Sequence, residues 1–142
     1  MLKYFDTGKI DKVYAINLEQ GDLLLESVNE FIEREHIENG VILSCIGTLD
    51  RCMLHMVTTT GYPPVEYFRR WEDTPLELSS TDGFIAGGKP HLHAVVSDKD
   101  IAFSGHVEEG CRVLYLMEIV IGRLDGKPLA RHPDEKGINK LG

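Results

Sequence analysis

The fold is decided by residues 90–107, whose sequence is PHLHAVVSDKDIAFSGHV. Two largely apolar runs, 90–97 and 101–107, flank a polar turn, and this pattern predicts a β-hairpin. A two-residue loop at Lys99–Asp100 would pair position 93 with 106 and position 97 with 102. Because side chains alternate along a strand, this register gathers one apolar set on a single face. That set comprises Leu92, Ala94, Val96, Ile101, Phe103, Gly105 and Val107.

The opposite face of this hairpin carries three histidines, His91, His93 and His106. Opposed side chains lie about 5 Å apart at Cβ and diagonal ones about 7–8 Å apart, so the three rings should converge. A slip of one residue would send His106 to the apolar face. Three neutral imidazoles suit zinc or another borderline divalent metal and leave one coordination position open. A His-X-His pair alone is a common accident on a half-exposed strand, but the third histidine in register favours a metal site.

Composition indicates one soluble domain over residues 1–142, with a core at about 13–122 and a C-terminal tail at 123–142. Hydrophobic residues make up 42% and charged residues 27% of the chain, as in ordinary globular proteins. There is neither an apolar run near 18 residues nor a secretory signal, so we expect a cytoplasmic protein without a membrane span. The net charge of −8 argues against DNA as a partner, because DNA affinity depends on Lys and Arg.

The number and spacing of the cysteines argue against disulfide bonds. Cys45, Cys52 and Cys111 are odd in number and lack paired spacing. We therefore expect reduced, mostly buried thiols rather than a disulfide framework.

The remaining patterns predict an α+β fold with a central, mainly antiparallel sheet and one principal helix. The helix is expected near residues 22–38, with Asp22 as its N-cap and Asn39–Gly40 as its stop signal. A turn at Asp50–Arg51 would separate two of the strands. The expected strands outside the hairpin are 12–18, 41–49, 52–60, 65–73, 75–86 and 111–122. The apolar runs 41–49 and 113–121 suggest burial on both faces, which oligomerisation could supply.

Three further polar residues interrupt apolar surroundings. Glu118 must be hydrogen-bonded, paired or at an edge. It is a candidate to orient a metal-bound histidine or to accept a proton, and an ion pair with an arginine across a subunit boundary is an equal alternative. Glu77 raises the same question with less force. His55, among apolar neighbours, is interpreted as a structural histidine.

With these segments in view, the chain resembles the plant-and-prokaryote-conserved (PPC) domain family from about residue 13 to residue 141. The matching stretches are GVILSCIGTLDRCML, LELSSTDG, HLHAVVSD, SGHVEEGCRV and ARHPDEKGINKL. The resemblance implies an α+β fold with a central antiparallel sheet, assembled as a homotrimer. One departure is Ser104-Gly105-His106, where Gly-Gly-His is usual in the family.

The family carries two functional implications. Many prokaryotic members are labelled as DNA-binding, after plant relatives with AT-hook segments, but this chain has no Arg-Gly-Arg-Pro hook. Acetolactate decarboxylase is similar in structure, and its zinc is held by a His-X-His pair plus a later histidine. That pattern matches His91, His93 and His106, although decarboxylation is not implied.

The leading hypothesis is therefore a homotrimer with one divalent metal per chain, foremost zinc, and an open site for a small oxygen-bearing ligand. Whether the protein is an enzyme stays open. One alternative is a DNA-associated regulatory module in which the metal is structural or incidental. Another is a non-catalytic unit for trimerisation or ligand sensing.

Overall fold

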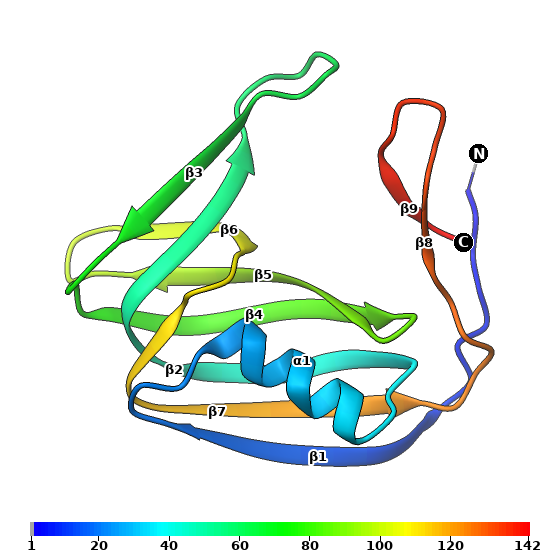
Figure 1. The fold of residues 1–142 in the computed structure, drawn as a ribbon, viewed down its shortest axis with the longest axis horizontal. Helices are drawn as coiled ribbons and strands as arrows, with labels where there is room; N and C mark the ends of the chain where they lie inside the picture. Colours follow the sequence, from blue (N-terminus) through cyan, green and yellow to red (C-terminus); the bar gives the residue numbers. More distant parts are fainter. Residues whose placement is uncertain (1) are drawn as a thin grey trace.

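The computed structural model describes residues 2–142, which form one short helix, α1, and the strands β1 to β9 (Figure 1). Most of the strands belong to a single antiparallel sheet, and the two short strands of the tail form a separate hairpin. The bounds are β1 Ile10–Glu19, α1 Leu24–Arg34, β2 Asn39–Val57, β3 Glu66–Trp71, β4 Leu76–Ala86, β5 Lys89–Ser97, β6 Ala102–Val107, β7 Arg112–Leu124, β8 Arg131–Pro133 and β9 Asn139–Leu141.

Strand β2 organises the main sheet, whose order is β1-β7-β2-β4-β5-β6. Its first part pairs with β7 and β4, whereas its last residues pair with β3 and β6. The return of β6 to β2, through Leu54 opposite Val107 and His55 opposite His106, joins β2, β4, β5 and β6 into a closed circuit. This closure brings His55 beside the β5–β6 hairpin.

The predicted hairpin register is confirmed. His93 lies opposite His106 and Ser97 lies opposite Ala102. The backbone N–H of Asp98 donates to the carbonyl of Ile101 at 3.1 Å, which closes the two-residue loop. Leu92, Ala94, Val96, Gly105 and Val107 are buried on the core side, while Phe103 is half-buried and Ile101 is exposed.

Helix α1 covers one face of the sheet and supplies part of the core (Figure 1). Its apolar stripe, Leu24, Val28, Phe31 and Ile32, is buried, as the helical spacing predicts. The expected ends were wrong by a few residues. Asp22 Oδ2 accepts a hydrogen bond from the Glu19 amide at 2.8 Å instead of capping the helix.

At the other end, the helix stops at Arg34, before the expected signal at Asn39–Gly40. His36 adopts a left-handed φ of 52°, which ends the helical path, and Asn39 already belongs to β2. The side-chain amide of Asn39 is fully buried and binds the backbone of the tail. It donates to the Lys127 carbonyl at 2.7 Å and accepts from the Leu129 backbone N–H at 3.0 Å.

The turn expected at Asp50–Arg51 was also wrong, because β2 runs through it without a break. The strand bends instead, with register shifts between Gly47 and Leu49 and between Leu49 and Arg51 in its ladder with β7. Asp50 is held by a bidentate pair from Arg112, at 2.8 and 2.9 Å. The polar residues that suggested a turn therefore form a cross-strand ion pair next to a bulge.

Two other expectations can be compared with the structure. All three cysteines are buried and free, as predicted. Over residues 2–142, no helix has the length and apolar character needed to cross a bilayer.

The α+β fold with a mostly antiparallel sheet and one helix is confirmed as a single domain. In the single chain, however, β2 and β7 are not buried on both faces. Large apolar side chains on one face of the sheet are about half exposed, namely Val13, Leu43, Ile46 and Leu116. The homotrimer stays a prediction.

Candidate metal centre

Four of the six histidines meet at one place in the fold: His91 and His93 from β5, His106 from β6 and His55 from β2. The ring centroids of the three predicted ligands are 5.1 Å apart for His91–His93, 5.1 Å for His91–His106 and 5.5 Å for His93–His106. The ring of His55 lies 4.6 Å from that of His106.

These spacings can be compared with what one ion would require. With zinc–nitrogen bonds of about 2.05 Å and a tetrahedral angle, two imidazole nitrogens lie about 3.3 Å apart and two ring centroids about 5.2 Å apart. The Nε2 atoms of His91 and His93 are 3.2 Å apart, and all three centroid distances lie close to the expected value. The His91–His93 pair therefore has the nitrogen spacing of two ligands on one tetrahedral metal, and the ring of His106 lies beside this pair.

The environment also favours the protonation state that a ligand needs. Partial burial is the main cause that lowers the pKa of both His91 and His93, and the neighbouring His106 lowers each further. A lowered pKa keeps these imidazoles neutral near neutral pH, with a lone pair available for a metal.

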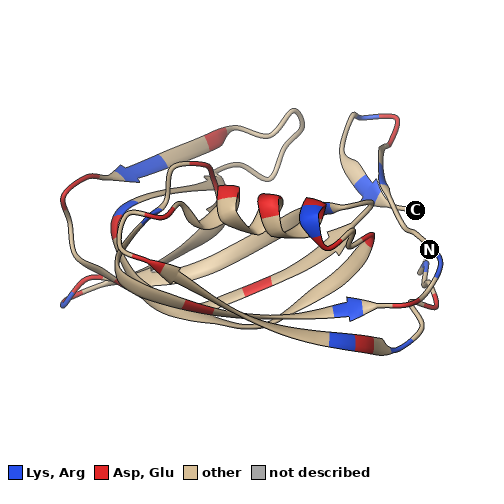
Figure 2. Cartoon of the chain, turned by 60° about the horizontal axis from the view of Figure 1, so that its bottom comes forward, with Lys and Arg blue, Asp and Glu red and all other residues tan. Residues whose placement is uncertain are grey.

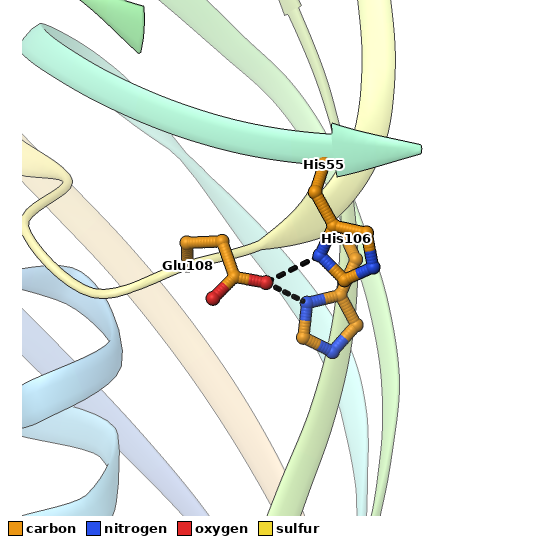
Figure 3. A group of neighbouring side chains, drawn as sticks. All are labelled: His55, His106 and Glu108. Carbon is orange, nitrogen blue, oxygen red and sulfur yellow. Dashed lines mark hydrogen bonds and ion pairs between the residues drawn. The ribbon is translucent and has the colours of Figure 1, made fainter. Parts of the chain in front are cut away.

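Glu108 connects the other two rings (Figure 3). One of its carboxylate oxygens, Oε1, contacts Nδ1 of His106 at 2.9 Å and also contacts Nδ1 of His55. When each Nδ1 carries a proton and donates it to the carboxylate, each Nε2 keeps its lone pair free. Glu108 thus sets the tautomer and the orientation of His106, as a carboxylate behind a metal-binding histidine does.

The backbone at Glu108 is itself fixed. Its amide donates to the carbonyl of Met53 on β2 at 3.1 Å, and its carbonyl accepts from the thiol of Cys111 at 3.3 Å. The carboxylate is therefore held by the strand that carries His55.

His55 and Glu108 are the residues that sequence reasoning missed. His55 was interpreted as a structural histidine, and the structure places it opposite His106, through the pairing of β2 with β6, and in contact with Glu108. No local pattern announces that long-range pairing. Glu108 did have a signal, since it follows His106 by two residues in HVE. Among the described residues, His55, His106 and Glu108 are the group whose ligand atoms all lie within 4.8 Å of one another, so they form a possible ligand group that shares His106 with the predicted one.

A cavity of about 550 Å³ opens beside the histidines, within the range of small-molecule sites. All four clustered histidines line it, together with the carboxylate-bearing Asp82 from β4. Its other walls are small or apolar: Met56, Val57, Ala94, Val95, Ser104 and Gly105. The cavity gives a small molecule access to the rings.

The two predicted carboxylates lie elsewhere in the chain. Glu118 is exposed on β7, with Asn17 and Ile46 as its cross-strand neighbours. Glu77 is exposed on β4 opposite Thr48 and Ser97. Neither is among the described residues that line the histidine cavity, so a role for Glu118 at a metal would require a second subunit.

Comparison with known proteins settles the family. The model of the Plants and Prokaryotes Conserved (PCC) domain, the family named PPC above, matches residues 5–125. The chain belongs to this family. This domain therefore covers the sheet, the helix and all four clustered histidines.

Solved structures with the same fold include two prokaryotic examples. A protein from Archaeoglobus fulgidus described as metal-containing has a TM-score of 0.83 and 23% identity, covering 99% of each chain. A candidate DNA-binding protein from Bacteroides thetaiotaomicron has a TM-score of 0.80 and 19% identity, covering 94% of each chain. Among curated proteins, the bifunctional protein GlmU of Synechococcus sp. (strain JA-2-3B'a(2-13)) is 25% identical over 124 residues. That match spans 87% of this chain but only 18% of the relative.

Proposed function

We propose that this PPC domain binds one divalent metal per chain, foremost zinc, through Nε2 of His91, His93 and His106. The observation that carries the proposal is the spacing of the three rings, 5.1, 5.1 and 5.5 Å between centroids, against about 5.2 Å for imidazoles on one tetrahedral zinc. The description of the Archaeoglobus fulgidus neighbour as metal-containing supports the same assignment.

Within this proposal the surrounding residues have distinct tasks. Glu108 contacts Nδ1 of both His106 and His55, so it would orient both rings. The proposal takes His106 as the ligand because it lies opposite His93 on the neighbouring strand, and it leaves His55 as a structural neighbour. A zinc ion held by three imidazoles would supply Lewis acidity at its open coordination position. The cavity next to the rings would admit a small oxygen-bearing ligand to that position. Glu118 is a proton acceptor in this scheme only if a neighbouring subunit brings it to the cavity.

The proposed assembly is a homotrimer. Its support in the single chain is the sheet face on which Val13, Leu43, Ile46 and Leu116 are about half exposed. Burying such a face against other copies removes apolar surface from water, which favours association.

DNA binding is the weaker candidate. The chain carries 23 acidic and 15 basic residues, and Figure 2 shows both kinds intermixed over the strands with several acidic residues on α1. A net negative chain loses the phosphate attraction on which most DNA affinity depends. A salt-dependent mobility shift with duplex DNA would favour this candidate, and no binding at low ionic strength would remove it.

Elemental analysis of purified protein tests the metal proposal. We expect one divalent ion per chain in the wild type and in the His132→Ala control, because His132 is exposed on β8. His93→Ala should lose the ion, whereas His55→Ala should retain it. Full metal content in His93→Ala would contradict the ligand assignment, and loss in His55→Ala with retention in His93→Ala would favour the group of His55, His106 and Glu108.

A further inference from the structure

A second cleft is lined by two of the same histidines, His91 and His106. His91 and His106 form one wall, and Lys89, Pro90, Ala130 and Arg131 contribute to the others. Its volume is about 630 Å³, again in the range of small-molecule sites. His91 and His106 therefore line two openings that differ in charge: the first is lined by Asp82, and the second by the cations Lys89 and Arg131.

Buried contacts of the tail fix the position of Arg131 in this cleft. The fully buried Asn39 binds the tail backbone at Lys127 and at Leu129. Leu129 is itself buried, two residues before Arg131. The hairpin of β8 and β9 then continues from Arg131. These contacts fix the position of the Arg131 backbone, from which the guanidinium extends.

The guanidinium is also held at its far end. Nη2 of Arg131 donates to the carbonyl of Phe84 at 3.0 Å, and Nη1 donates to the carbonyl of Lys89 at 3.2 Å. Phe84 is the cross-strand partner of His91, so these bonds place the cation near the end of β4 and the start of β5, close to the histidine. Two carbonyls use two of the five N–H donors of an arginine, and the other donors stay available.

No acidic side chain within residues 2–142 pairs with this charge. Within the described residues 2–142, neither Lys89 nor Arg131 forms an ion pair, although the net charge of the whole chain is −8. The lining of the cleft contains no Asp or Glu among those residues. Two cations without an ion-pair partner among those residues, one of them a partly buried arginine, favour the binding of an anion.

We propose that the cleft of Lys89 and Arg131 binds the carboxylate of a small ligand whose other oxygen reaches the histidine centre. The placement of the second oxygen rests on the proposed metal site, whereas the binding of the carboxylate does not. A planar guanidinium with free N–H donors matches a carboxylate in shape as well as charge. A small hydroxy- or keto-carboxylate carries its carboxylate and its second oxygen within a few bonds of each other. This spacing fits a cationic cleft and a proposed metal site that have His91 in common.

Calorimetric titration of zinc-loaded protein with glycolate, glycolamide and inorganic phosphate tests the inference. Wild type should bind glycolate more tightly than glycolamide, its neutral analogue. Arg131→Gln should weaken glycolate binding about tenfold or more, as the loss of a charge-assisted pair does, and leave glycolamide unchanged. Lys127→Gln is the matched control, because Lys127 is an exposed cation on the same tail outside the cleft.

Further arms separate the outcomes. Lys89→Gln should also weaken glycolate binding, and it removes a cation without touching the tail. Zinc content and thermal unfolding of each variant show that the site and the fold persist. Equal glycolate affinity in wild type and Arg131→Gln, no glycolate binding by wild type, or Arg131-dependent binding of phosphate alone would each overturn the inference.

The same titration in chelator-treated protein distinguishes this inference from the metal proposal. Glycolate binding that depends on Arg131 in a protein that takes up no metal would support the anion site while the metal proposal fails. Normal metal content together with glycolate binding that ignores Arg131 would leave the metal proposal standing and overturn the anion site.

Discussion

Gly105 and His55 pass each other so closely that a Cβ on Gly105 would lie 2.7 Å from the carbonyl oxygen of His55. The glycine is thus the condition for pairing β6 with β2, which joins His55 to the hairpin histidines. Its neighbour Ser104 is exposed and lines the cavity, so a different side chain at position 104 would not be forced against β2.

This contact predicts that Gly105→Ala separates β6 from β2. The free energy of unfolding should fall by about 1–3 kcal/mol, the usual cost of forcing an extra methyl group into a packed position. Ser104→Ala should change it by less than about 0.5 kcal/mol. Chemical denaturation of both variants measures the difference, and equal stability would show that the strands can part without cost.

Glu108 should govern metal affinity without binding the metal. Glu108→Ala removes the acceptor for Nδ1 of both His55 and His106, so we expect affinity to fall about 10–100-fold. Competition with a coloured chelator measures the loss. Glu109→Ala removes an exposed carboxylate next to it and should leave affinity unchanged; the same loss in both variants would make the effect one of net charge.

The tail hairpin should loosen in acid. A hydrogen bond from Lys140, followed by the Ile138 amide, holds the pKa of Asp134 at about 2, below its usual 3.8. The carboxylate therefore contributes stability that is complete above pH 3.8 and is lost as pH falls toward 2. We expect the amide signal of Ile138 to report this loss by NMR in that window. The transition should vanish in Asp134→Asn and persist in Glu135→Gln.

The half-exposed sheet face should be the site of self-association. Ile46→Asp places a charge among Leu43, Leu116 and Val13 and should convert a trimer into monomers in sedimentation velocity. Ile101→Asp adds the same charge at another exposed apolar residue, in the hairpin loop, and should not. A wild-type mass of one 16.0 kDa chain would refute the trimer, and so would a trimer that survives Ile46→Asp.

Local patterns sufficed where one segment carries all the information. The hairpin register follows from the alternation of 90–107, and the helix follows from its apolar stripe. Polar residues misled where their partners are remote: Asp50 resembled a turn residue because its arginine, Arg112, lies 62 positions away. The buried Asn39 resembled a helix stop because its partners are in the tail.

The candidate site divides in the same way. His91, His93 and His106 could be grouped from two adjacent strands, whereas His55 depends on the closure of β2 onto β6. Arg131 depends on the path of the tail, which Asn39 anchors from 88 and 90 positions away, at Lys127 and Leu129. Residues that join a site through long-range pairing leave no spacing pattern in the sequence.

The most direct test of the three-histidine centre is an anomalous difference map from crystals of the zinc-loaded protein, collected at the zinc edge. We expect one peak per chain at about 2.0–2.1 Å from Nε2 of His91, His93 and His106, with Glu108 outside bonding distance. A peak bonded to His55, His106 and Glu108, with His91 and His93 left out, would contradict it.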